Sequence, residues 1–457
     1  MYLQRLLNLS TKEQTMRPSM SSIALRKHRK RNFLRVILVA LGLLWGSLPA
    51  DGGENWPQFR GPTGLGYTEE KNLPLQWGGP ANENVLWKSP LSGAGHASPI
   101  VWGDAVIVCT AKWPADGAPQ DNVMPDHHVA CYRAADGKLL WDTIVPPGPW
   151  LRKNAGDKPG GGYAAPTPVT DGKLVYCVFG SSVIAALDFQ GKIVWRKEIV
   201  PYSFDVMMGG SPVLYQDTVI LLSAMNGGSN VSALDKASGE VKWQQKFPDM
   251  GFGHSTPVII SVKEKPQLLL LASGMAEKDN ALRSLDPASG KLLWWCRGAS
   301  DASSPAFGSG IVYFDSGRGG KGVAVDPGGA GDVSATHIRW TGPRIPEAVS
   351  SPIIVGPHVY RLHSPGVLKC WRASTGEQVY SERLAGISTT WASPVADGDG
   401  RLYFASAGKG YVIQSGPEFR VLAVNDLGDG NHASPAVAKG RLFLVGQKNL
   451  YCIQQGK

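Results

Sequence analysis

Residues 211–243 read SPVLYQDTVILLSAMNGGSNVSALDKASGEVKW, and this pattern decides the fold because versions of it recur along most of the chain. It opens with Ser-Pro, continues through apolar, β-branched runs, and ends in a Gly followed four positions later by an aromatic residue. Pro is tolerated at the first residue of a strand, where its missing N–H costs no ladder bond. The Gly supplies the positive φ of a tight turn, and the aromatic residue is expected to pack between neighbouring sheets.

The Ser/Thr-Pro pair that opens this pattern recurs at a regular spacing. Consecutive copies lie 41 to 48 residues apart after a first interval of 69, with Ser or Thr at positions 98, 167, 211, 256, 304, 351, 393 and 434. A period in the forties that holds four strands' worth of residues is typical of propeller blades. The eight copies therefore predict eight blades.

The two ends of the repeat region complement each other. The eighth copy reaches Ile453 without residues for a fourth strand, while an orphan strand, Asn84–Lys88, precedes the first copy. Pairing the two would complete the last blade and remove the open edges of the ring. We therefore predict an all-β fold, an eight-bladed β-propeller of four-stranded antiparallel blades, closed by the N-terminal strand.

The composition agrees with this fold class and excludes others. Gly (56) and Pro (33) are abundant and 18% of the residues are charged, which excludes a coiled coil or a helical bundle. The 15 Trp and the apolar content of 43% exclude a disordered chain. Residues 1–50 hold nine of the 46 basic residues and one of the 37 acidic ones, so the remainder is nearly neutral and no nucleic-acid partner is expected.

The first 50 residues have the pattern of an export signal. A basic segment, Arg26–Arg35, precedes the apolar run Val36–Trp45 and the ending Ser47–Ala50. This run is shorter than the about 20 apolar residues of a membrane span. We expect a signal peptide or N-terminal anchor (1–50), an N-terminal extension (51–83) and the propeller (84–457), forming an exported monomer of the periplasm or cell envelope. Membrane contact is expected only if the leader is retained.

The six cysteines form neither a CxxC motif nor an adjacent pair, which argues against a metal cluster. Most lie inside apolar, strand-like runs, so we expect buried free thiols. Cys109 and Cys131 flank the same insertion, and theirs is the one disulfide that we consider.

Two hairpins, Ala233–Trp243 and Ser284–Trp294, resemble the pyrroloquinoline-quinone (PQQ) repeat of quinoprotein alcohol dehydrogenases and of the outer-membrane assembly lipoprotein BamB. The resemblance covers about residues 84–453, and the opening Trp56–Gly66 is similar to the start of many exported PQQ-repeat proteins. It implies the propeller fold and leaves the function open. Two features of the PQQ dehydrogenases are missing here, namely the adjacent Cys-Cys pair and the long insertions that complete their substrate cavity.

The long connections are expected on one face of the ring. In a propeller with this strand order, the A–B and C–D hairpins share one face, and the B–C and D–A loops share the other, hereafter the loop face. Insertions at 111–128 and 142–164 fall on the loop face. Long loops on a rigid scaffold usually carry binding residues. The inner strands begin with small residues, so we also expect an aqueous funnel along the axis.

Four aromatic side chains occupy one repeat position, three residues before the Pro: His96, His254, Trp391 and His432. This position starts the innermost strand, facing the funnel. Blades 7, 8 and 1 are contiguous in a closed ring, so Trp391, His432 and His96 should line one arc, with His254 opposite. The alternative is that these histidines cap strand entries by hydrogen-bonding neighbouring loops.

The B–C loops place cations toward the same rim, namely Arg318, Lys321, Lys409 and Lys448. PQQ, which would bind together with calcium, carries three carboxylates, and these would require several such cations. The alternative is that these four side chains are solvated loop tips without a ligand. The loop Asp426–Asn431 offers oxygen ligands without EF-hand spacing. The run Asp126–His128 would hold a transition metal only with ligands from elsewhere. We assign no metal to either.

Two hypotheses of function follow. The first is a non-catalytic exported propeller that binds a protein, a glycan or a small ligand through its loop face. It rests on the near-minimal repeats, the neutral body and the absence of catalytic motifs. The alternative is a PQQ-dependent alcohol or sugar oxidoreductase with the cofactor in the central funnel, which the repeat and the His/Trp/Lys rim support. Whether the insertion around Trp150–Lys153 plugs the funnel is left open.

Overall fold

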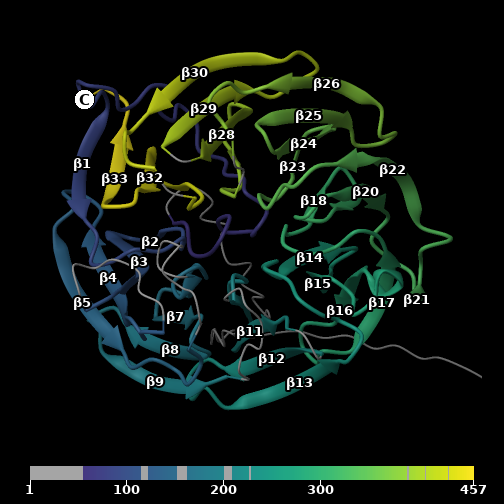
Figure 1. Ribbon diagram of the computed structural model, residues 1–457, viewed down its shortest axis with the longest axis horizontal. Coiled ribbons are helices and arrows are strands. Elements are labelled where there is room, and N and C mark those ends of the chain that lie inside the picture. Colours follow the sequence, from purple (N-terminus) through teal and green to yellow (C-terminus); the bar gives the residue numbers. More distant parts are fainter. Residues whose placement is uncertain are drawn as a thin grey trace, which may run out of the picture. The chain divides into compact units, whose positions relative to one another are not determined.

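The computed structural model describes residues 55–114, 122–151, 162–199, 208–225, 228–388, 391–406, 408–430 and 432–456. Over these residues, eight sheets of antiparallel strands, one of them extended by a short parallel strand, follow one another around a central axis (Figure 1). The predicted eight-bladed, all-β propeller is confirmed. None of the helices in these ranges is long and apolar enough to span a membrane.

The blades are numbered in chain order, and their strands run outward from the axis. Blades 1 to 4 contain β2 (Ile100–Trp102), β3 (Ala105–Lys112), β4 (Asp126–Arg133) and β5 (Leu139–Val145); β6 (Val169–Thr170), β7 (Leu174–Phe179), β8 (Val183–Asp188) and β9 (Ile193–Glu198); β10 (Val213–Tyr215), β11 (Thr218–Ser223), β12 (Ser229–Asp235) and β13 (Val241–Phe247); β14 (Val258–Val262), β15 (Lys265–Ala272), β16 (Ala281–Leu285) and β17 (Leu292–Arg297). A short 3-10 helix, η2 (Glu277–Asp279), lies between β15 and β16.

Blades 5 to 8 follow the same plan. They contain β18 (Ala306–Gly308), β19 (Ile311–Phe314), β20 (Gly320–Val325) and β22 (Ile338–Ile345); β23 (Ile353–Val355), β24 (His358–His363), β25 (Val367–Arg372) and β26 (Gln378–Arg383); β27 (Val395–Ala396), β28 (Arg401–Ser406), β29 (Lys409–Gln414) and β30 (Arg420–Asp426); β31 (Ala436–Ala438), β32 (Arg441–Val445), β33 (Asn449–Gln454) and β1 (Val85–Pro90).

The last blade takes its outer strand from the N-terminal side of the chain, as predicted. β1 pairs antiparallel with β33, from Val85 opposite Ile453 to Pro90 opposite Asn449. Figure 1 shows the purple β1 beside the yellow β33. This pairing gives the three C-terminal strands the fourth strand that they lack and closes the ring.

The repeated Gly and Trp join each blade to the next on the outer side of the ring. Trp195 on β9 lies against Gly239 in the following blade, and its indole N–H donates to the carbonyl of Lys236 at 2.9 Å. Gly239 has φ +72°, and a Cβ there would lie 2.7 Å from the Trp195 ring. We call five such contacts the tryptophan girdle: Trp87 on Gly137, Trp141 on Gly191, Trp195 on Gly239, Trp243 on Gly290 and Trp340 on Gly376.

Blade 4 departs from the predicted four strands. The two-residue strand β21 (Gly331–Asp332) pairs in parallel with β17, at Trp294 and Trp295. β21 belongs to the long connection between β20 and β22 of blade 5. This extended hairpin reaches back to the neighbouring blade and covers its outer edge.

The six cysteines are buried and free, as expected for thiols in strand interiors. Cys109 and Cys131 do not form the disulfide that we considered. Although β3 and β4 are neighbours, Cys109 lies opposite Val129 and Cys131 lies opposite Ile107, so their side chains are offset along the ladder.

The N-terminal extension forms a strap, which we define as residues 55–84, across the face opposite the loop face. The carbonyl of Pro57 accepts from the N–H of Thr170 in blade 2, at 2.9 Å. Three residues later, the Arg60 guanidinium donates to the carbonyl of Pro352 in blade 6, at 2.7 Å. Blades 2 and 6 lie on opposite sides of an eight-membered ring, so the strap crosses the axis, as the purple segment does in Figure 1.

Candidate functional site

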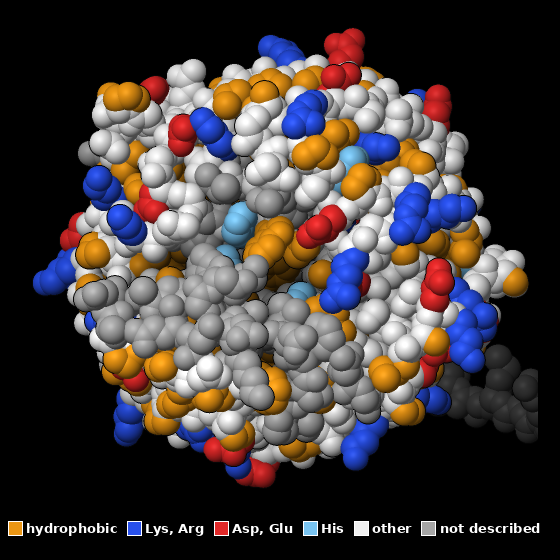
Figure 2. Space-filling view, viewed as in Figure 1, with side chains coloured by type: hydrophobic (Ala, Val, Ile, Leu, Met, Phe, Trp, Pro, Cys, Tyr) orange, Lys and Arg blue, Asp and Glu red, His pale blue; other side chains and the backbone are white. Residues whose placement is uncertain are grey.

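A cavity of about 320 Å³ lies on the propeller axis. All eight blades contribute to it through the residues that start their inner strands. Figure 2 views the molecule along the axis and shows histidine side chains and an apolar patch gathered at the centre of the face in view. The funnel expected from the small inner-strand residues is therefore present.

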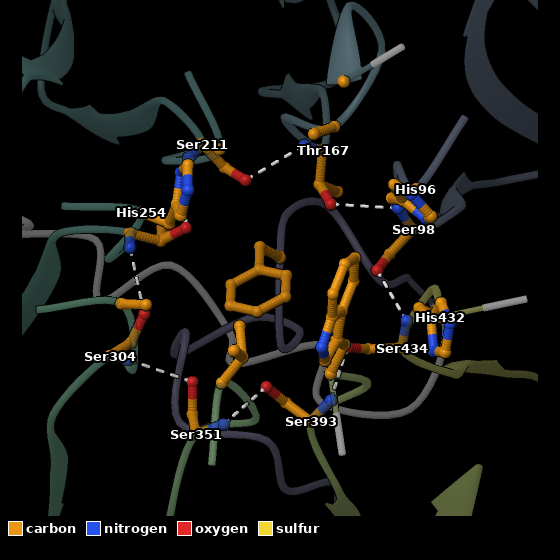
Figure 3. Close-up of a pocket in the computed structure, with 18 of the residues that line it drawn as sticks. His96, Ser98, Thr167, Ser211, His254, Ser304, Ser351, Ser393, His432 and Ser434 are labelled. Atoms are coloured by element: carbon orange, nitrogen blue, oxygen red, sulfur yellow. Dashed lines mark hydrogen bonds between the residues drawn. The ribbon is translucent and has the colours of Figure 1, made fainter. Parts of the chain in front are cut away.

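The repeated Ser or Thr forms a closed ring of hydrogen bonds around this cavity. In each blade, the backbone N–H of this residue donates to the hydroxyl oxygen of its counterpart in the next blade, from Ser98 to Thr167 onward (Figure 3). The last bond runs from the N–H of Ser434 back to the Ser98 hydroxyl at 2.9 Å, and all eight lie between 2.8 and 3.1 Å. We call this set the hydroxyl ring; it comprises Ser98, Thr167, Ser211, Thr256, Ser304, Ser351, Ser393 and Ser434.

The floor of the cavity comes from the strap. Phe59, between the blade 2 contact of Pro57 and the blade 6 contact of Arg60, lines the cavity together with the hydroxyl ring. Arg60 is buried, and its pKa is lowered to about 9 because it is desolvated and lies near the Arg361 cation. The insertion around Trp150–Lys153 lies partly outside the described residues, and its Trp150 packs against the core of blades 1 and 2. The strap thus closes the axis on its own side of the ring, and the sequence pattern does not mark its residues as a plug.

One wall of the cavity holds the predicted aromatic arc. The ring centroids of Trp391 and His432 are 4.8 Å apart, and His96 lies 5.5 Å from Trp391 and 5.7 Å from His432. Burial lowers the pKa of His432 below its ordinary value, which favours the neutral imidazole. The structure therefore brings together the three residues that the ring closure placed side by side.

The opposite wall holds His254 in a different environment. Its ring meets that of Phe252 edge to face at 4.6 Å. Burial and the nearby Arg318 cation lower the pKa of His254 to about 4. Arg318 lies over the Phe252 ring at 4.5 Å and forms an ion pair with Asp301, with Nε and Oδ2 2.9 Å apart. Burial raises the pKa of Asp301 to about 6 despite this partner.

The three predicted lysines lie away from the cavity lining, unlike Arg318. The Lys409 ammonium pairs with Asp426 at 2.6 Å, and Lys321 is exposed on β20. Lys448 is also exposed, and its backbone N–H donates to Asp429 at 3.2 Å. Of the four cations proposed for the rim, the structure places Arg318 alone at the cavity.

The two segments considered for metal binding, of which Asp126–His128 begins β4, use their side chains structurally. The Asp429 carboxylate accepts from the N–H groups of Gln447 and Asn449 and from the Tyr451 hydroxyl, so it orders the β32–β33 turn. His127 is buried, lies 2.7 Å from the Ser181 hydroxyl and stacks on Phe179. Among the described residues, no group of three or more His, Cys, Asp or Glu side chains is arranged to hold a metal ion.

The described residues of the cavity do not fit PQQ with calcium. PQQ would bring three carboxylates, whereas Arg318 is the one Lys or Arg in the described lining and already pairs with Asp301. Glu347 is the one carboxylate in that lining, and the described histidines, cysteines and carboxylates offer no metal-ligand set. Binding an anion of that charge would leave its carboxylates desolvated and unpaired. We derive no chemistry through this cofactor.

Sequence reasoning found the aromatic arc and missed the floor and the hydroxyl ring. The signal for the ring was present, because a hydroxyl residue precedes the Pro in all eight repeats. The Pro is explained by its place at the start of the strand, whereas the role of the hydroxyl before it becomes visible only when neighbouring blades are in contact. Phe59 lies outside the repeat, and no pattern in the sequence places it on the axis.

Fold and site together define a PQQ-type repeat propeller with an axial cavity closed at one end. The chain belongs to the family described as outer membrane protein assembly factor BamB, whose model matches residues 125–296 and 267–415. Among curated proteins, it is 32% identical over 152 residues to XoxF of Paracoccus denitrificans, which is named as a dehydrogenase, covering 31% of this chain and 24% of that protein. It is 23% identical over 251 residues to tetrathionate hydrolase of Acidithiobacillus ferrooxidans, covering 50% of this chain and 45% of that protein. The chain thus matches less than half the length of either relative.

Solved structures that share the fold include a BamB and a quinohemoprotein alcohol dehydrogenase. BamB from Moraxella catarrhalis superposes with a TM-score of 0.57 at 14% identity, covering 81% of this chain and 97% of that one. Quinohemoprotein alcohol dehydrogenase from Comamonas testosteroni superposes with a TM-score of 0.65, also at 14% identity, covering 89% of this chain and 82% of that one. At this identity the likeness concerns the fold alone.

Proposed function

We propose that this protein is a non-catalytic binding propeller of the cell envelope that takes a ligand into its axial cavity from the loop face. The observation that carries the proposal is the cavity itself: an aromatic-lined space on the axis, with a floor supplied by the strap. Ligand sites in proteins are usually concave and largely apolar, with a few placed polar groups. Arg318 and Glu347, both exposed, supply such groups beside the apolar walls.

The chemistry of the described lining supports binding over catalysis. His254 has a pKa of about 4, which makes it a weak base at neutral pH. The Arg318 cation is engaged with Asp301. The envelope location is supported by the export-type leader and by membership of a family described for outer membrane assembly.

The test uses the neutral fluorescent dye 6-propionyl-2-(dimethylamino)naphthalene, which carries a flat aromatic body and one carbonyl acceptor. We expect saturable binding of one dye per protein, with its Kd raised at least tenfold by Trp391→Ala and unchanged by Lys321→Ala, a matched exposed site outside the cavity. Equal binding by the Trp391→Ala variant would place the dye elsewhere and overturn the proposal. A second assay follows the oxidation of alcohols or sugars by the reduction of an artificial redox dye after addition of PQQ and calcium. Activity in this assay would overturn the non-catalytic part of the proposal and favour the oxidoreductase alternative.

A further inference from the structure

The floor of the cavity combines an aromatic side chain with a circle of hydroxyl groups. Phe59 lies among the eight residues of the hydroxyl ring, all of which line the cavity. Each ring hydroxyl accepts one backbone N–H, and within the described part of the chain none donates its own hydrogen. A Ser or Thr hydroxyl has one donor and two acceptor positions. Each ring member therefore keeps a donor, and one lone pair, for a guest.

We infer that the cavity binds the terminal sugar of a neutral glycan. This inference rests on the proposed function and names its ligand class. A pyranose has apolar C–H faces and carries its hydroxyls around its edge. An aromatic floor surrounded by hydroxyls matches that distribution, because the apolar face of the sugar is covered by Phe59 while its edge meets hydrogen-bonding groups. Trp391 and Phe252 provide further aromatic surface on the two walls.

The charge of the lining selects a neutral guest. The described lining has one Arg and one Glu, and Arg318 is already paired with Asp301. His254 and His432 are held toward their neutral forms by burial. An anionic guest would lose its hydration without gaining an unengaged cation, whereas sugar hydroxyls exchange water for neutral hydrogen bonds.

The closed floor limits binding to the end of a glycan chain. A volume of about 320 Å³ is near the lower end of ligand pockets, about 300–1,000 Å³, so the cavity holds a small guest. The strap blocks passage through the axis, since Pro57 is tied to blade 2 and Arg60 to blade 6. A chain that enters from the loop face must therefore present its terminus.

The experiment measures displacement of the neutral naphthalene dye by sugars. Linear maltotriose and cellotriose are compared with α-cyclodextrin, which has glucose units but no end, with glucuronate, which is anionic, and with glycerol, which has hydroxyls but no ring. We expect at least one linear neutral oligosaccharide to displace the dye at concentrations at least tenfold lower than the other three. The variant Phe59→Leu keeps an apolar floor without an aromatic face. It should raise the Kd of the sugar by a factor at least five times larger than the factor by which it raises the Kd of the dye. Lys321→Ala should change neither Kd.

The outcomes separate this inference from the function on which it rests. If the dye binds in the cavity and no linear sugar displaces it, the ligand class is wrong while the binding function stands. If α-cyclodextrin competes as well as the linear sugars, recognition of a chain end is wrong. If the dye does not bind, or binds equally to Trp391→Ala, the proposed function fails first.

Discussion

The propeller joins neighbouring blades in two places, and the two differ in regularity. Near the axis, the hydroxyl ring repeats one backbone N–H to hydroxyl bond at all eight junctions. On the outer side, the tryptophan girdle repeats its contact at five junctions, and between blades 6 and 7 Tyr380 lies beside Phe419 instead, with ring centroids 5.6 Å apart. The outer contact is mainly apolar area, for which different residues substitute, whereas a buried N–H requires an acceptor at one position.

The largest expected effect is the loss of a girdle tryptophan. Trp195→Ala should lower the free energy of unfolding by about 3–5 kcal/mol, because a buried indole is removed and a cavity is left between blades 2 and 3. Val194→Ala, at a position 47% exposed on the same strand, should change it by less than about 0.5 kcal/mol. Urea denaturation followed by circular dichroism measures both. Equal effects of the two substitutions would show that the girdle does not hold the blades together.

The glycine that receives the indole should come second. Gly239→Ala adds a methyl group 2.7 Å from the Trp195 ring at φ +72°, whereas Gly440→Ala adds one at φ +71° with no heavy atom within 4 Å. Both variants should lose about 1–2 kcal/mol for the left-handed backbone, and Gly239→Ala should lose a further 1–3 kcal/mol, roughly, for overpacking. The same denaturation assay applies. If the two variants lose the same stability, the close Gly–Trp contact carries no energy of its own.

A single break in the hydroxyl ring should cost somewhat less. Ser211→Ala leaves the buried N–H of Thr167 without its acceptor, at a cost of about 1–3 kcal/mol. Ser211→Thr should be close to neutral, because Thr already serves at positions 167 and 256. Hydrogen exchange of the Thr167 amide should accelerate in Ser211→Ala and not in Ser211→Thr. Unchanged exchange in Ser211→Ala would mean that this amide is protected by something other than the ring.

The smallest expected effect is a pH dependence at the axial side, where His254 lies; the tryptophan girdle has no titratable group. Unfolded His254 gains a proton below about 6.5, whereas in the folded protein its pKa is about 4, so stability falls as the pH decreases between these values. The facing groups are Arg318 and Asp301; the raised pKa of Asp301, about 6, adds stability as the pH falls below that value and partly offsets the loss. His254→Gln should reduce the stability difference between pH 6.5 and 5 by on the order of 1 kcal/mol. An identical pH profile for the variant would contradict the assignment.

The sequence predicts the repeated parts of this molecule well and the unrepeated parts poorly. Ser/Thr-Pro spacing, Gly-to-Trp spacing and the orphan strand determine blade number and closure, because they recur with a fixed geometry. Because blades 7, 8 and 1 are neighbours in the closed ring, the sequence also predicts that one arc of the cavity holds Trp391, His432 and His96. The fifth strand of blade 4 was missed because Gly331 and Asp332 show no strand pattern and pair only through tertiary contact.

The same difference between repeated and unrepeated parts of the sequence explains which site residues could be predicted. The path of Phe59 across the axis is set by hydrogen bonds of the strap to blades 2 and 6. One uses the backbone carbonyl of Pro57 and the other uses the side chain of Arg60, and neither residue belongs to a repeated pattern. The position of a loop predicts where a Lys or Arg backbone lies, but the ion-pair partner determines where its charged group ends. Lys409 pairs with Asp426, away from the cavity, whereas Arg318 pairs with Asp301 beside it.

The pairing of β1 with β33 also sets an order for biosynthesis. Asn84 accepts from the N–H of Gly456 across a separation of 372 positions, so the early strand has no partner until the last blade has been made. Contacts of such long range are slow to form, and an unpaired strand edge promotes aggregation while it waits. The ring is therefore complete only after the whole repeat region has been synthesised. Its slowest step is expected to be the final docking of the first strand onto the last sheet, and the period before this docking is when the chain most needs protection by chaperones.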